Sequence, residues 1–319
     1  MTSSRAYGLV LGLSTLLLAR GLGAQSRHEF TAVHMGVQVR MVLHAPTEHV
    51  AREAARAAFA RIAELDDKMS DYRPHSEVRM LSERPWDWQP VSQELLHVLA
   101  LAQEVSLKSG GAFDVTIGPL VQLWRASKQS GRLPDAVALT RARFRTGVPL
   151  LEVDPERGMV RLWARDMQLD LGGIAKGYIL QEALAVLRKR GVPSAMIEAG
   201  GDLVVGEAPP GQPGWSVYVA SGDTTVLRRA RALTNAAVAT SGGSEQFVEV
   251  NGVRYSHVID PRTGLGTTGR HLVTVIADDG ALADAAATAL SVLGPVNSAH
   301  FQSLLPRALV SFRIPTDTR

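Results

Sequence analysis

Two clusters of residues have the types and spacing that binding a phosphate and a cation requires. One runs from Asp170 through Gly172, Gly173 and Lys176 to Tyr178, where a helical pattern begins. Paired glycines let a ligand approach the backbone, N–H groups at a helix start attract phosphate oxygens, and Lys176 adds a positive charge. The glycine spacing is neither that of a P-loop nor that of a dinucleotide fingerprint. Taken alone, the cluster also fits a tight turn without a ligand.

The second cluster is an oxygen pair in an alanine-rich segment near the carboxyl end. Asp284 and Thr288 are four residues apart, so a helix would place both side chains on one face, one turn apart. A carboxylate and a hydroxyl are hard oxygen ligands that Mg²⁺ accepts while it keeps positions for phosphates and water. The alternative is a solvent-facing Asp, with the Thr hydroxyl bonded to its own helix.

Two further positions offer a ring-binding surface and a base. Phe113 and Asp114 follow a glycine pair, and an apolar ring face beside an acceptor suits a heteroaromatic ligand. A helix C-cap explains the glycines without any ligand. His257 precedes an Asp-Pro turn, and its unperturbed pKa of about 6.5 suits a general base, although a lone His is more often structural.

The elements that must hold these residues show both helical and strand periodicity. Apolar spacing predicts helices from Val50 to Met69 with Thr47 as a cap, from Ser92 to Lys108, around 180–187, and from Leu282 to Leu293, ended by Gly294. Extended segments are predicted at 30–43, 150–153, 159–163 and 167–171, with more strands between 195 and 275 and a Pro/Gly loop over 206–215. The sum predicts an α+β fold with mixed or antiparallel sheets and no clean domain linker.

Composition excludes several classes of protein. The chain has 319 residues, of which 45% are hydrophobic and 20% charged, as in a globular protein with a sizeable core. It has no cysteine, so disulfides, thiolate metal sites and a Cys nucleophile are excluded, and any metal must use oxygen or nitrogen ligands. The net charge of +3 comes with scattered arginines and 5% aromatic residues, so no nucleic-acid partner is predicted.

Residues 1–24 have the pattern of a cleavable secretory signal. Arg5 precedes an uncharged, Leu-rich stretch over 6–19, which is shorter than the ~20 residues of a membrane span. Small residues then precede Gln25. We therefore expect removal of residues 1–24, a mature domain over 25–319, and export to a bacterial periplasm; the alternative is a buried amino-terminal helix.

In their order along the chain, these clusters resemble the ApbE-type flavin transferase family, the FAD:protein FMN transferases. The resemblance spans residues 33 to 294. The matching segments are His34-Met35-Gly36, Met69-Ser70-Asp71-Tyr72, 110–119, 170–178, Glu198-Ala199-Gly200-Gly201-Asp202, Ala239-Thr240-Ser241-Gly242, 256–264 and 283–290. One departure is Val37, which stands where the family usually has Thr.

The resemblance implies a compact mixed-sheet α/β body of two subdomains, with FAD and Mg²⁺ in the cleft between them. It implies that FAD is split, that FMN passes through its phosphate to a Thr or Ser hydroxyl of a partner flavoprotein, and that AMP leaves. FAD contacts are implied at Met35, Tyr72, Ala112, Phe113, Asp114, Asp170, Lys176 and Val258. Metal ligands are implied at Asp284, Thr288 and the main-chain carbonyl of Gly173. We assign deprotonation of the incoming hydroxyl to His257, with Asp284 as its rival.

Three hypotheses of different classes follow. The first is a transferase that modifies an exported or membrane-anchored flavoprotein subunit. The second is an Mg²⁺-dependent FAD pyrophosphatase in which water is the acceptor, so that FMN and AMP are both released. The third is a non-catalytic flavin carrier. The fate of FMN, whether attached to an acceptor, free or not formed, distinguishes the three.

Overall fold

The structure is a computed structural model that describes residues 25–219, 229–243 and 247–313. The predicted signal over 1–24 lies outside the described residues. No helix within the described ranges is long and apolar enough to cross a membrane.

The main sheet has seven strands in the order β1-β2-β6-β7-β10-β15-β16, and each neighbouring pair is antiparallel. The first pair is a hairpin that matches the predicted extended segment, and its nine residue pairs run from Ser26–Ala45 to His34–Val37. The strands are β1 (Ser26–His34), β2 (Val37–Ala45), β6 (Ala195–Ala199), β7 (Asp202–Val205), β10 (Ala236–Gly242), β15 (Leu272–Ala277) and β16 (Leu309–Arg313).

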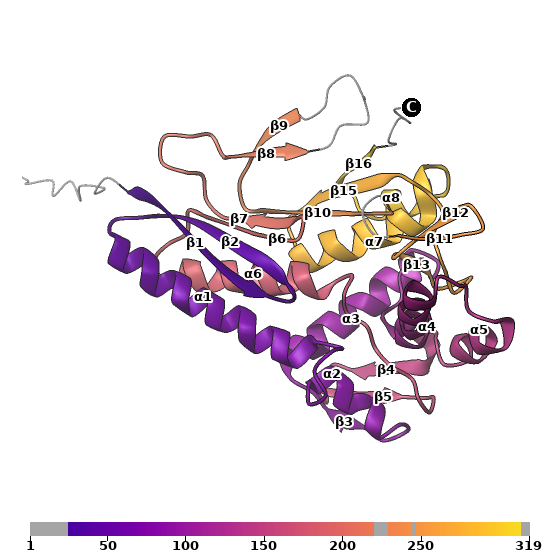
Figure 1. Ribbon diagram of the computed structural model, residues 1–319. Coiled ribbons are helices and arrows are strands. Elements are labelled where there is room, and N and C mark those ends of the chain that lie inside the picture. Colours follow the sequence, from indigo (N-terminus) through magenta and orange to yellow (C-terminus); the bar gives the residue numbers. More distant parts are fainter. Residues whose placement is uncertain (1–24, 220–228, 244–246, 314–319) are drawn as a thin grey trace, which may run out of the picture.

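Three long helices pack against one face of this sheet, as Figure 1 shows: α1 (Glu48–Met69), α6 (Ala175–Lys189) and α7 (Gly280–Asn297). In α1, residues at three- and four-residue spacing, among them Ala51, Ala58 and Ile62, are fully buried. Thr47 caps this helix by accepting the N–H of Val50. Periodic apolar burial therefore fixes which side of α1 faces the sheet.

The opposite face of the sheet is covered in part by a second hairpin, β8 (Trp215–Val219) and β9 (Arg229–Leu233), which stands above the sheet in Figure 1. Trp215 packs there with Val42, Val205 and Val238 from the main sheet. The segment from 206 to 214 between β7 and β8 is a loop, as its prolines and glycines predict.

A second part of the molecule carries its own hydrophobic cluster. Leu120, Trp124, Ala142, Val248 and Ile259 form it, and they come from α4 (Gly118–Ser130), α5 (Ala136–Arg143), β11 (Phe247–Val250) and β13 (Ile259–Asp260). The hairpin partners are β12 (Val253–Ser256) and β14 (Leu265–Gly266). This cluster is distinct from the main core, in agreement with the two-part body implied by the resemblance.

The remaining elements join the main core from the side. They are α2 (Glu77–Met80), α3 (Gln93–Lys108), α8 (Ala299–Ser303), the 3-10 turns η1 (Leu81–Glu83), η2 (Val115–Ile117) and η3 (Val148–Leu150), and a three-stranded sheet of β3 (Gln89–Pro90), β5 (Met159–Leu162) and β4 (Leu151–Asp154). Ser92 caps α3 by accepting the N–H of Leu95.

Two glycines let α6 and α7 cross in direct contact. A Cβ atom on Gly177 would lie 1.9 Å from the carbonyl oxygen of Gly280, and one on Gly280 would lie 2.3 Å from the carbonyl oxygen of Gly177. Side chains at either position would force the helices apart. The crossing brings the first turn of α6 against the first turns of α7, two segments about a hundred residues apart in sequence.

The predicted α+β class is confirmed, as are the four helices that the sequence predicts. The helical geometry of α7 is interrupted at Gly294, where the sequence predicts the end of the helix. The strand predicted over 167–171 is wrong. Its backbone bonds go to a turn and a helix start instead of a ladder, since Asp170 N donates to Val115 O and Gly118 N donates to Gln168 O.

Candidate active site

A cavity of about 590 Å³ lies between the main body and the second part of the molecule. This volume is within the range of roughly 300–1,000 Å³ that small-molecule and cofactor sites occupy. Every predicted site residue except Met35 contributes to its wall: Tyr72, Ala112, Phe113, Asp114, Asp170, Gly173, Lys176, His257, Val258, Asp284 and Thr288. Residues far apart in sequence therefore converge on one site.

Met35 lies in the turn between β1 and β2, outside the cavity wall. Its backbone has a positive φ of 52°, and its N–H donates to Asp66 Oδ2 at 3.3 Å. The side chain packs against the main core. Val37, two residues further on, lines the cavity. The FAD contact implied for Met35 stays a prediction.

The three predicted metal ligands meet where α6 and α7 cross. A Cβ on Gly173 would lie only 3.0 Å from Thr288 Oγ1, so the Gly173 backbone touches that hydroxyl side chain. Asp284 lies one turn before Thr288 on α7 and accepts the N–H of Gly177 at 3.2 Å. The absence of a side chain on Gly173 leaves its main chain open to the same space.

This oxygen set fits Mg²⁺. One carboxylate, one hydroxyl and one main-chain carbonyl are hard ligands, and Mg²⁺ keeps its other positions for phosphate oxygens and water. Among the residues that the structure describes, no group of three or more His, Asp or Glu side chains is arranged to hold a metal. A magnesium ion here would be held by Asp284, Thr288 and the main-chain carbonyl of Gly173.

Lys176 lies between two buried carboxylates. Its ammonium donates to Asp202 Oδ2 and lies 3.4 Å from Asp284 Oδ1. Lys176 comes from the first turn of α6, Asp284 from α7, and Asp202 from the start of β7. The side chains of Asp202 and Asp284 are almost completely buried. This arrangement places one positive charge at the cavity wall, where it can attract phosphate oxygens.

The same burial changes the proton affinity of these groups. Burial raises the pKa of Asp284 to about 6, the ammonium of Lys176 opposes the rise, and the Asp202 carboxylate adds to it. Burial alone would lower the pKa of Lys176, but the Asp284 and Asp202 carboxylates outweigh it and raise that pKa above its ordinary value. Lys176 therefore stays charged at neutral pH.

Phe113 and Asp114 line the same cavity next to the α6–α7 crossing. Phe113 is buried, and its Cε2 atom would lie 3.2 Å from a Cβ on Gly173. Asp114 caps η2: its Oδ1 accepts the N–H of Thr116 at 2.8 Å, and its Oδ2 accepts the N–H of Val148 at 3.1 Å. These contacts give Asp114 a role in holding the loop, and its contact with FAD stays a prediction.

Arg125 contacts three other residues of the cavity wall: Tyr72, Asp71 and Asp170. Its guanidinium carbon lies 4.3 Å from the ring centre of Tyr72, and its Nη2 lies 2.6 Å from Asp71 Oδ2 and 3.7 Å from Asp170 Oδ2. Tyr72 is 75% exposed, which leaves its other ring face open to a ligand. Burial and the Asp71 carboxylate raise the pKa of Asp170, while Gly172 N–H and Arg125 oppose the rise.

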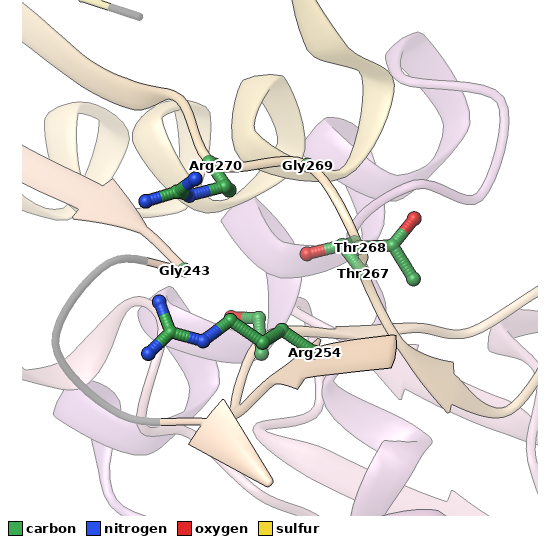
Figure 2. Close-up of a pocket in the computed structure, with 7 residues that line it drawn as sticks. Gly243, Arg254, Thr267, Thr268, Gly269 and Arg270 are labelled. Atoms are coloured by element: carbon green, nitrogen blue, oxygen red, sulfur yellow. The ribbon is translucent and has the colours of Figure 1, made fainter. Parts of the chain in front are cut away.

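His257 lies in the bend between β12 and β13, with an exposed side chain at the cavity wall beside the buried Val258. A second, smaller pocket of about 70 Å³ adjoins this region. Figure 2 shows Arg254 and Arg270 on facing segments of that pocket, with both guanidinium groups toward the same side. Its volume suits a few water molecules and not a dinucleotide. The larger cavity is therefore the candidate active site.

Sequence reasoning assigned no role to Asp71, Arg125 or Asp202. Asp71 and Asp202 belong to segments that carry the resemblance, so position within a motif was a usable signal for both. Arg125 had no such signal, because α4 itself was not predicted. Its relation to Asp71 depends on a contact across 54 residues.

Fold and site together define a class: an α+β protein whose antiparallel sheet and crossed helices hold a lysine and an oxygen-ligand set at an internal cavity. The chain belongs to the ApbE family, whose model matches residues 35–309.

Known proteins with related sequences and structures agree with this assignment. The chain is 32% identical to an FAD:protein FMN transferase of Klebsiella pneumoniae over 256 residues, which cover 76% of this chain and 72% of the relative. A second Klebsiella pneumoniae relative of the same name is 30% identical and covers 84% and 83%. The apo crystal structure of flavinyl transferase ApbE from Pseudomonas stutzeri superposes with a TM-score of 0.78 at 28% identity, covering 92% of both chains. The ApbE protein of Thermotoga maritima gives 0.79 at 29% identity, covering 89% and 93%.

Proposed function

We propose that this protein is an FAD:protein FMN transferase. The observation that carries the proposal is the convergence of the Lys176 ammonium, the oxygen set of Asp284, Thr288 and Gly173, and His257 on one cavity. Phosphoryl-type transfer needs positioned charge more than covalent help, and this cavity supplies such charge. The names of the related sequences support the same reaction.

The residues divide the work by chemistry. Lys176 offsets negative charge on the FAD pyrophosphate, and Tyr72 and Phe113 offer apolar ring faces for the flavin or adenine. Asp284, Thr288 and the Gly173 carbonyl would hold Mg²⁺, which would supply positive charge to offset the negative charge on the phosphates. Mg²⁺ dependence is part of the proposal.

His257 acts on the acceptor. It accepts the proton of a Thr or Ser hydroxyl, and that oxygen forms a bond to the phosphorus of the FMN half. The phosphoanhydride bond breaks, its electron pair leaves with AMP, and FMN remains joined to the acceptor through its phosphate. Asp284 is the rival for this proton, but its contacts with Gly177 N–H and Lys176 and its place in the metal site favour His257.

The cellular setting belongs to the same proposal. Residues 1–24 have the order of charge, apolar run and small residues typical of a secretory signal, so we place the mature protein in the periplasm. The acceptor would then be an exported or membrane-anchored flavoprotein subunit.

Incubating the purified protein with FAD and Mg²⁺, with and without a Thr-containing acceptor flavoprotein, tests the activity. Flavin fluorescence of the denatured acceptor reports attached FMN, and chromatography of the supernatant reports free FMN and AMP. We expect FMN on the acceptor and an equal amount of AMP. Free FMN with either sample and none attached would show a hydrolase, and intact FAD in both would show a carrier. An Asp284→Ala variant serves as the matched control.

A further inference from the structure

A buried carboxylate outside the cavity wall has no place in the mechanism above. Asp202, at the start of β7, does not line the cavity, and its side chain is only 4% exposed. Its Oδ1 accepts the N–H of Thr240 at 3.1 Å, and its Oδ2 accepts a hydrogen bond from the Lys176 ammonium. A buried carboxylate is stable only when paired, so Lys176 is the group that balances it.

The Lys176 ammonium is shared unequally between two carboxylates. Its contact with Asp202 is the shorter one, while Asp284 Oδ1 lies 3.4 Å away. An ammonium in full contact with Asp284 would occupy an oxygen that a metal ion needs. Asp202 therefore competes with Asp284 for the same positive charge from a buried position outside the cavity wall.

We propose that Asp202 is a positioning residue: it holds the Lys176 ammonium off Asp284 and so keeps the Asp284 carboxylate available to a divalent cation. This inference rests on the proposed function, because it assumes that Asp284 is a metal ligand. Two carboxylates and one ammonium leave one negative charge in excess, which favours a cation beside Asp284.

The variant Asp202→Asn removes the negative charge of the side chain and keeps its shape. Its amide oxygen still accepts the Thr240 N–H, and its volume is nearly unchanged, but it no longer holds an ammonium. Lys176 would then pair with Asp284. The probe is Mn²⁺ alone, with free Mn²⁺ counted by paramagnetic resonance in solutions of the full mature protein. We expect the Mn²⁺ affinity to fall about tenfold or more.

A double-mutant cycle with Lys176→Met is the control. Removing a nearby negative charge weakens cation binding in any background, and that contribution is comparable with and without the ammonium at a pH at which Asp202 stays ionised in Lys176→Met, which the pH dependence of Mn²⁺ binding by that variant establishes. We therefore expect Asp202→Asn to cost much more affinity when Lys176 is present than in Lys176→Met. Equal losses in the two backgrounds would overturn the positioning role. Asp202→Ser, which also accepts the Thr240 N–H, replaces Asp202→Asn if thermal unfolding shows that the latter does not fold.

The cycle also separates this inference from the function on which it rests. If Asp284→Ala binds Mn²⁺ as tightly as the wild type, the metal assignment fails, and the role of Asp202 fails with it. If Asp284→Ala loses Mn²⁺ but the cycle shows no coupling, only the role of Asp202 is wrong. A coupled cycle in a protein that attaches no FMN to an acceptor would support the positioning role and contradict the transferase.

Discussion

Asp284 and Thr288 contribute unequally to the predicted metal site because only one of them carries a charge. Asp284→Ala removes the one carboxylate among the three predicted ligands, and with it several kcal/mol of charge stabilisation. We expect FMN transfer to slow by at least about 100-fold, which corresponds to about 2.7 kcal/mol. The measurement is the transfer rate as a function of Mg²⁺ concentration.

Thr288→Val is the matched control, since it keeps the side-chain shape and removes only a neutral ligand. The transfer rate of Thr288→Val should fall less than that of Asp284→Ala, and the fall should become smaller as the Mg²⁺ concentration is raised. A folded Asp284→Ala protein with near-normal turnover at low Mg²⁺ would contradict the assignment.

His257 can be tested apart from FAD binding because a base acts on the acceptor hydroxyl and not on bound FAD. We expect His257→Asn to bind FAD within a few-fold of the wild type and to transfer FMN at least ~100-fold more slowly, the lower end of general-base contributions. The decisive measurement is the rate at saturating FAD, with FAD affinity measured separately by flavin fluorescence.

A purely structural histidine would give another result. Its loss would lower thermal stability and FAD affinity together, and the rate would fall only as the bound fraction falls. Full recovery of the rate at saturating FAD would exclude His257 as the base and leave Asp284 as the candidate.

At the scale of elements, helices are predictable from the sequence where apolar residues recur periodically and a capping residue marks the start of the helix. Thr47 and Ser92 cap α1 and α3, and both helices follow from apolar spacing. Sequence reasoning missed α4, because a Gly-Pro pair at 118–119 reads as a turn, although Pro is well tolerated in a first helical turn. It also missed α5, a short helix capped by Asp135 with a single buried residue, Ala142, and so little periodic signal.

The candidate site was predictable to the extent that its parts are local. Asp284 and Thr288 share a helix, so their spacing alone predicts a common face. The meeting of Gly173 with Thr288 depends on two helices crossing, and the pairing of Lys176 with Asp202 depends on β7 starting beside the first turn of α6. No local pattern encodes such long-range packing, and the resemblance to a family supplied the first of the two.

The α6–α7 crossing gives a prediction at this scale. A methyl group on Gly177 would lie 1.9 Å from the Gly280 carbonyl oxygen, so Gly177→Ala must push the helices apart. We expect a loss of roughly 1–3 kcal/mol of unfolding free energy, as overpacking typically costs. We also expect weaker Mg²⁺ binding, because the crossing holds Gly173 against Thr288. Urea unfolding and Mg²⁺ titration measure the two effects.

Gly280→Ala tests the same contact from the other helix, since its Cβ would lie 2.3 Å from the Gly177 carbonyl oxygen. The two variants should therefore behave alike. Unchanged unfolding free energy and Mg²⁺ affinity in both would show that the crossing has room to adjust and does not position the metal ligands.

On the scale of the whole molecule, the cavity needs both parts of the body. The main body supplies Lys176, Asp284 and Thr288, while the second part supplies His257 and Arg125. The predicted proton acceptor and the predicted charge-bearing wall therefore come from different parts of the molecule and line the same cavity. An acceptor hydroxyl entering between the two parts would meet the base and the phosphate together.

The last prediction concerns how the chain is processed. Cleavage before Gln25 would leave β1 whole, because all nine of its pairs with β2 lie between Ser26 and Ala45. Removing residues 1–24 therefore costs the described fold no strand pairing. We expect the periplasmic fraction of a bacterium that expresses the full chain to contain a protein whose intact mass starts at or near Gln25. As a control, Leu16→Arg interrupts the apolar run and should leave uncleaved protein in the cytoplasm. Periplasmic protein that retains Met1 would contradict the signal cleavage, and wild-type protein confined to the cytoplasm would contradict the proposed encounter with an exported acceptor.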